Sequence, residues 1–205
     1  MSSSGGEAGR WNERYGSASY FYGTEPNDFV VETADRIRTH GNVLCLAEGE
    51  GRNAVYLAKQ GHHVTAVDQS LVGLEKARRL AAESRVQIEI VPADLADYDL
   101  GTDRWDAILS VWCHLPSALR AVVHRGCVRA LKPGGVFILE SYTPDQLRHG
   151  TGGPKDLDLL PTLAMLQMEL QGLVLDVAVE RERVVHEGKG HDGMSAVVQL
   201  VGRKV

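Results

Sequence analysis

The strongest constraint on the fold is a regular alternation of apolar, strand-like runs with amphipathic, helix-like runs that begins at Val43. The strand-like runs are VLCLA, HVTAVD, VQIEIV, WDAILSVW and GVFILES, and the helix-like runs between them are NAVYLAKQ, LVGLEKARRLAAE and ALRAVVHRGCVRAL. Apolar strands that alternate with helices are typical of a parallel sheet covered on both faces. The pattern therefore predicts an α/β fold with a mostly parallel sheet and helices on both faces.

The two ends of the chain depart from this alternation. Residues 1–10, MSSSGGEAGR, are small and polar and predict a flexible tail, whereas Pro26 introduces a helical pattern with Phe29, Val30 and Ile37 on one face. At the other end, helix-like TLAMLQMEL precedes two strand-like runs, LVLDVAVERERVV and SAVVQLVGRK. HEGKGHDGM between them reads as a hairpin loop, so we expect the final strand to be antiparallel.

Composition limits the kind of protein. With 205 residues, of which 43% are hydrophobic, the chain suits one core, and we expect a single domain over residues 11–205. A formal net charge of -5 argues against nucleic acid as a partner, because phosphate backbones are bound by clustered Lys and Arg. No apolar run approaches the ~18 residues that span a bilayer. We therefore expect a cytoplasmic protein that binds no membrane and acts as a monomer or homodimer.

The three cysteines have no metal-binding spacing. Cys45, Cys113 and Cys127 lack CxxC or Cys/His patterns, and free cysteine behaves as a small hydrophobic residue. We interpret them as reduced thiols of the core and expect no metal.

The stretch VLCLAEGEGRN, residues 43–53, predicts a ligand site after the first strand of the sheet. Gly49 and Gly51 let the backbone approach a ligand, and the next helix points its N-terminus there. Asp68 ends the second strand about 20 residues after Gly49, the offset at which an acid meets ribose hydroxyls. Asp94 and Leu95 follow the third strand, so three strand ends converge on an adenosine cofactor. The alternative is a plain strand-to-helix turn with Asp68 as a helix cap, and GxGxxA also fits NAD.

The motifs VLCLAEGEGRN, AVDQS, PADLADYD, WDAILSVWCHLP and LKPGGVFILE resemble, in this order, those of class I S-adenosylmethionine-dependent methyltransferases. WNERY, YGTEPN, TGGPKDLDLL and EGKGHDGMSAVVQL further resemble a small bacterial branch grouped with tellurite-resistance and thiopurine methyltransferases. The resemblance implies a Rossmann-like seven-stranded sheet that ends in an antiparallel hairpin. It also implies that Gly49 and Gly51 lie under the methionine part of the cofactor, while Asp68 binds the ribose. Cys45 and Ala47 replace the usual strand acid and first glycine of that family.

The expected site residues lie after the strands and in the aromatic N-terminal segment. The expected cofactor contacts are Tyr22, Glu48, Gly49, Gly51, Asn53, Asp68, Gln69, Asp94, Leu95 and Trp112. Three further residues lie on loops at the ligand side and are the candidate catalytic groups: His114, Lys155 and His191.

The leading hypothesis is a methyltransferase that uses S-adenosyl-L-methionine and a small-molecule acceptor. The resemblance favours a soft nucleophile, such as a thiol, a tellurium or selenium oxyanion, or a halide. Such a displacement needs mainly positioning of the acceptor. The alternatives are an NAD-dependent oxidoreductase and a non-catalytic cofactor-binding protein that needs a partner subunit.

Overall fold

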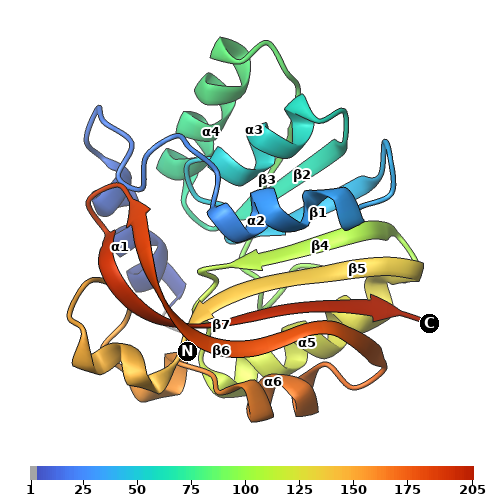
Figure 1. The fold of residues 1–205 in the computed structure, drawn as a ribbon. Helices are drawn as coiled ribbons and strands as arrows, with labels where there is room; N and C mark the ends of the chain where they lie inside the picture. The colour runs from blue at the N-terminus through green and yellow to red at the C-terminus, as the bar shows by residue number, and fades with distance from the viewer. Residues whose placement is uncertain (1–3) are drawn as a thin grey trace.

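A computed structural model describes residues 4–205, which form a seven-stranded sheet in the order β3-β2-β1-β4-β5-β7-β6 (Figure 1). The strands are β1 (Asn42–Leu46), β2 (His63–Asp68), β3 (Glu89–Pro92), β4 (Trp105–Val111), β5 (Leu131–Tyr142), β6 (Leu173–Glu187) and β7 (His191–Lys204). The first five strands are parallel, and the strand order reverses between β1 and β4. The predicted α/β fold with a mostly parallel sheet is confirmed.

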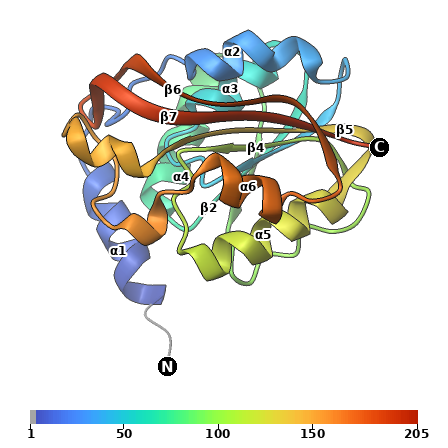
Figure 2. The same cartoon turned by 60° about the horizontal axis from the view of Figure 1, so that its bottom comes forward.

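Helices cover both faces of this sheet (Figure 2). They are α1 (Ser4–Tyr15), α2 (Asp28–Thr33), α3 (Arg52–Lys59), α4 (Leu71–Glu83), α5 (Ser117–Ala130) and α6 (Leu163–Glu169), with 3-10 turns η1 (Ala34–Arg36), η2 (Pro144–Arg148) and η3 (Leu157–Leu159). One buried cluster joins α2 and α3 to one face of the sheet, and a second joins α5 and α6 to the other. Within residues 4–205, every helix is too short or too polar to cross a lipid bilayer.

The C-terminal hairpin is confirmed, with a shorter loop than predicted. β7 is antiparallel to both β5 and β6, and the pairing of Glu187 with His191 leaves only residues 188–190 in the turn. β6 therefore runs in the same direction as the first five strands. This direction brings the turn to the edge of the sheet where the glycine loop lies.

Three predicted elements differ at their ends. β3 begins at Glu89 rather than Val86, because the Val86 N–H bonds to the Ala81 carbonyl at the end of α4. The helix expected from Phe29 to Ile37 ends at Thr33 and continues as the η1 turn. Residues 4–10 of the predicted flexible tail belong to α1, and residues 1–3 lie outside the described residues.

Candidate functional site

The glycine loop lies at the carboxyl end of β1, beside the reversal of strand order, where ligands bind in open α/β sheets. Gly49 has φ +60, and a Cβ at this position would lie 2.6 Å from the Tyr15 hydroxyl. Gly51 has φ +91, and a Cβ there would lie 2.5 Å from the Ala77 Cβ on α4. The absence of a side chain at Gly49 thus lets Tyr15 pack directly on the loop, whereas its absence at Gly51 lets α3 and α4 pack together.

Asp68 is bound to the glycine loop by a hydrogen bond. Its Oδ2 accepts from the Gly49 N–H at 2.8 Å and its Oδ1 accepts from the Ser70 N–H at 2.7 Å. Burial raises the pKa of Asp68, and these backbone donors oppose the rise. A carboxylate accepts about four hydrogen bonds, so both oxygens retain capacity for the hydroxyls of a ribose.

The end of β3 lies next to Asp68, because the Ala93 N–H donates to the Asp68 carbonyl. Asp94 and Leu95, which follow Ala93, are half-buried, and Asp94 Oδ1 accepts from the Ala96 N–H. The three strand ends predicted to converge therefore do lie together. They bring Gly49, Asp68 and Leu95 to one edge of the sheet.

Glu48 turns away from the surface of the loop. Its carboxylate accepts from the Ala54 N–H at 2.8 Å, and so binds to the N-terminus of α3. It also forms a hydrogen bond with the fully buried Cys45. Burial raises the pKa of Glu48 to about 7, although the backbone of α3 and Arg52 oppose the rise. Glu48 thus supplies an acid beside Cys45, the position where the family resemblance expects a strand acid.

Other polar residues of the same loop hold the N-terminal segment 16–27. Glu50 accepts from the Phe21 N–H at 2.7 Å and forms a buried ion pair with Lys76 on α4. Asn53 Oδ1 accepts from the Asn27 N–H at 2.9 Å. Asn53, predicted to contact the cofactor, thus holds this segment through its side-chain amide oxygen.

An aromatic cluster occupies the carboxyl ends of β4, β5 and β6. We define it as Tyr22, Trp112, His114, Tyr142 and His191, whose neighbouring ring centroids lie 4.4 to 6.3 Å apart. Four of its five members were predicted as site residues, and the structure brings them together from distant parts of the chain. Tyr142 was missed because it ends a continuously apolar strand, where sequence alone indicates packing.

A buried carboxylate, Glu187 at the end of β6, orients this cluster. It accepts from Trp112 Nε1 at 2.6 Å and from Arg52 Nη2 at 2.5 Å, and it contacts His191 Nδ1 at 3.4 Å. Burial would raise the pKa of Glu187, but His191 and the Arg52 guanidinium outweigh it and lower the pKa to about 2. Trp112 adopts φ +54, a costly conformation for an aromatic residue, and the bond to Glu187 helps to hold it there.

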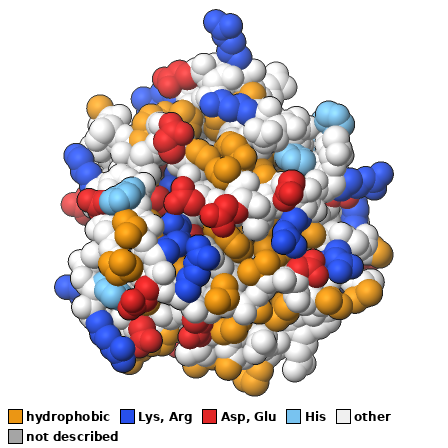
Figure 3. All heavy atoms as spheres, viewed as in Figure 1, with side chains coloured by type: hydrophobic (Ala, Val, Ile, Leu, Met, Phe, Trp, Pro, Cys, Tyr) orange, Lys and Arg blue, Asp and Glu red, His pale blue; other side chains and the backbone are white. Residues whose placement is uncertain are grey.

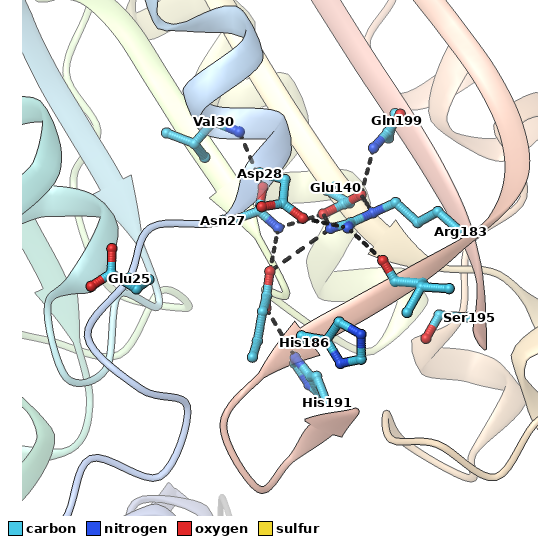
Figure 4. Close-up of polar contacts among 12 residues, drawn as sticks. Glu25, Asn27, Asp28, Val30, Glu140, Arg183, His186, His191, Ser195 and Gln199 are labelled. Carbon is cyan, nitrogen blue, oxygen red and sulfur yellow. Dashed lines mark hydrogen bonds and ion pairs between the residues drawn. The ribbon is translucent and has the colours of Figure 1, made fainter. Parts of the chain in front are cut away.

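A second buried carboxylate, Glu140 on β5, extends this network (Figure 4). Arg183 on β6 donates to both oxygens of Glu140 at 2.8 Å, and Asn27 Nδ2 donates to Glu140 at 2.5 Å and to Glu187 at 2.8 Å. Sequence analysis missed Asn27, Glu140, Arg183 and Glu187. No local pattern marks the bonds between them, because Arg183 and Glu140 lie 43 residues apart and Asn27 and Glu187 lie 160 residues apart.

Two predicted site residues, Lys155 and Gln69, do not take part in the aromatic cluster or its hydrogen bonds. Lys155 is exposed and forms no ion pair with any residue in the range 4–205. Gln69 is half-buried next to Asp68, and its side chain has no hydrogen bond within the described range. His191, predicted on a loop, is instead the first residue of β7 and is only 4% exposed.

The cysteines are buried free thiols, as predicted. Cys45, Cys113 and Cys127 form no disulfide, and burial raises the pKa of each. Acidic and basic side chains are interspersed over the face seen in Figure 3. This distribution differs from the continuous basic surface that binds a phosphate backbone.

Residues 43–135, a little under half of the chain, match the family model described as a methyltransferase domain. This part of the chain is similar to a methyltransferase domain. The chain is 30% identical over 141 residues to a ubiquinone biosynthesis O-methyltransferase of Alkalilimnicola ehrlichii, an alignment that covers 65% of this chain and 55% of the relative. The chain spans about half the length of the curated relatives that it matches first.

Solved structures confirm the methyltransferase fold over nearly the whole chain. A structure described for the conversion of a disulfide bond into a thioacetal group during echinomycin biosynthesis aligns with a TM-score of 0.74, at 18% identity, over 98% of this chain and 92% of its own. TehB from Haemophilus influenzae aligns with a TM-score of 0.70, at 17% identity, over 95% of this chain and 66% of its own. At these identities the likeness concerns the fold.

Proposed function

We propose that the protein transfers a methyl group from S-adenosylmethionine to a small-molecule acceptor. The observation that carries the proposal is the bond between Gly49 and Asp68 at the strand-order reversal, with the aromatic cluster beside it. The methyltransferase domain and the relative that methylates a ubiquinone precursor by name support the same reaction class. The cofactor supplies an electrophilic methyl group on a positively charged sulfur.

The residues of this chain would hold the two reactants next to each other. Gly49, Asp68, Asp94 and Leu95 would bind the adenosine and methionine parts, next to Tyr15, which packs on Gly49. Trp112 and Tyr22 present aromatic faces, which attract a positive sulfur. Because methyl transfer is an in-line displacement, placing the acceptor against the methyl group in a dry pocket supplies most of the catalysis.

The acceptor is proposed to be a soft nucleophile. The fold of the chain resembles TehB, but at 17% identity this likeness does not carry over an acceptor. The support is the cluster itself, since polarisable atoms pack well against aromatic rings.

Calorimetry with S-adenosylmethionine and, separately, with NAD tests the cofactor. We expect binding of S-adenosylmethionine and none of NAD, and tighter binding of NAD would overturn the proposal. Release of S-adenosylhomocysteine with a panel of thiols, phenols, halides and oxyanions then tests catalysis. Binding of S-adenosylmethionine without turnover of any acceptor, alone or with cell extract added, would indicate a non-catalytic binding protein.

A further inference from the structure

Two polar atoms of the aromatic cluster are buried without a hydrogen-bond partner among residues 4–205. They are Nε2 of His114 and the hydroxyl of Tyr142. The two rings are parallel to within 5°, with centroids 5.7 Å apart, and the Tyr142 side chain is 0% exposed. Buried polar groups without a partner are rare in folded proteins and call for a ligand or another explanation.

The hydrogen bonds of His114 fix which of its nitrogens carries the proton. Nδ1 lies 3.4 Å from the Leu159 carbonyl and 3.5 Å from Ser141 Oγ. The carbonyl only accepts, and Ser141 donates its own proton to the Tyr142 carbonyl. Nδ1 is therefore the protonated nitrogen. Burial and the neighbouring His191 lower the pKa of His114 to about 3, so the ring is neutral and Nε2 presents a bare lone pair.

Tyr142 offers the complementary group. Burial raises the pKa of its hydroxyl, and nearby Ser195 only partly opposes the rise, so Tyr142 keeps its proton. Ser195 donates its own proton to the Gly193 carbonyl at 3.1 Å. A hydrogen-bond acceptor and a hydrogen-bond donor therefore belong to the same aromatic cluster.

We propose that the methyl acceptor is a neutral molecule with a protic nucleophile, a thiol or a hydroxyl, held between His114 and Tyr142. Its S–H or O–H donates to His114 Nε2, and its sulfur or oxygen accepts from the Tyr142 hydroxyl. This inference rests on the proposed methyl transfer and redefines its acceptor class: a thiol is one of the soft nucleophiles proposed above, whereas a hydroxyl is a harder nucleophile that the same two groups would bind. A halide has no hydrogen to donate, and the lone pair of Nε2 repels an anion.

The charges of the surrounding network agree with a neutral acceptor. Arg52 is paired with Glu187 at 2.5 Å, and Arg183 is paired with Glu140 at 2.8 Å. Arg52 and Arg183 are thus already neutralised by carboxylates, and a third arginine, Arg14, lies on the exposed side of the cluster, where it donates to the Tyr22 hydroxyl at 3.0 Å. An anionic acceptor would have to compete with these buried pairs for its countercharge.

In the methyl-transfer step, His114 accepts the proton that the nucleophile loses. The lone pair of the acceptor's sulfur or oxygen forms a bond to the methyl carbon, and the electron pair of the former carbon–sulfur bond stays on the departing sulfur. The acceptor proton passes to His114 Nε2 and then to water. The products are the methyl thioether or ether, S-adenosylhomocysteine and one proton. The positive charge moves from the sulfonium to the imidazole, so the net charge of the buried site is unchanged during the step.

The test compares benzenethiol and phenol with iodide and tellurite as acceptors for the protein saturated with S-adenosylmethionine. We expect S-adenosylhomocysteine release with a protic probe and none with iodide or tellurite.

His114→Asn keeps a donor near Nδ1 but removes the Nε2 lone pair, and should lower kcat/KM by about 100-fold or more. Tyr142→Phe should raise KM about tenfold. Affinity for S-adenosylmethionine should stay within about threefold in both, and the exposed His186→Asn serves as the matched control.

Calorimetry of the same probes with the S-adenosylhomocysteine-loaded protein gives a readout that does not need turnover. Methylation of iodide or tellurite that His114→Asn leaves unchanged would overturn the protic acceptor and leave the proposed function standing. The inference also fails if the loaded protein binds none of the protic probes. Absence of S-adenosylmethionine binding in the wild type would instead overturn the proposed function itself.

Discussion

The two halves of the site are built by different means. The cofactor half, at the ends of β1, β2 and β3, depends on local features: two glycines, one aspartate and backbone N–H groups that they bring together. The acceptor half, at the ends of β4, β5 and β6, depends on side chains that pair across the fold, with Glu187 and Glu140 at the centre. The proposed cofactor half is thus built from short motifs, whereas the proposed acceptor half is assembled from pairs of residues far apart in the sequence.

Among the substitutions that test this difference, Glu187→Gln is expected to have the largest effect on stability. Glu187→Gln leaves Arg52 buried without its countercharge, and breaking a buried pair in this way costs about 3–5 kcal/mol of unfolding free energy. Denaturant unfolding measures the loss. Glu182→Gln, an exposed neighbour on β6, is the control and should change stability by less than about 0.5 kcal/mol.

The same substitution has a pH signature. The pKa of Glu187 is lowered to about 2 in the folded protein, below the unfolded value of about 4.3. Its contribution to stability is therefore present above about pH 4.3 and is lost as the pH falls toward 2. The stability difference between wild type and Glu187→Gln should shrink across that window, and a difference independent of pH would argue that packing rather than charge is lost.

Glu48 should show the opposite dependence in the cofactor half. Its pKa is raised to about 7, so ionisation favours the unfolded state and stability falls as the pH rises from about 4.3 to 7. Glu48→Gln keeps a group that accepts from the Ala54 N–H and removes the charge. We expect the variant to be more stable than wild type at pH 8, by about 4 kcal/mol at most, and equal or less stable at pH 4. Equal pH profiles for the two proteins would show that Glu48 does not titrate in this range.

Asp68 tests whether the local features of the cofactor half bind the cofactor. Hydrogen bonds to a charged group contribute about 1.5–3 kcal/mol, so Asp68→Asn should weaken S-adenosylmethionine binding by about tenfold or more. Calorimetry measures the affinity, and circular dichroism confirms folding. Asp97→Asn, on the exposed turn after β3, is the control, and equal affinities for Asp68→Asn and wild type would remove Asp68 from the cofactor site.

The smallest effect is expected at Lys155, which motif position alone placed among the catalytic residues. Because this lysine is exposed and lies outside the aromatic cluster, Lys155→Ala should change kcat/KM by less than about threefold. A loss of 100-fold with the best acceptor would show that residues 149–156 rearrange over the acceptor during the reaction, and would extend the acceptor half to this loop.

The sequence by itself determined the order and type of the strands, the antiparallel end of the sheet and the convergence of Gly49, Asp68 and Asp94. These follow from periodicity and from short motifs whose residues act on their own neighbourhood. Only the tertiary structure decided which side chains face one another. It turned Glu48 toward Cys45, engaged Asn53 with Asn27, and placed Tyr142 beside His114.

The physical reason is the distance along the chain over which each feature is specified. A turn, a helix start or a strand is specified by residues within a few positions of one another. The Glu187 network joins residues from the segment before α2, the start of α3 and the ends of β4, β6 and β7, and its members are neighbours only once the sheet has formed. His191 and Arg52 then set the low pKa of Glu187, and burial leaves the polar atoms of His114 and Tyr142 without protein partners. Neither property belongs to any one residue in the sequence.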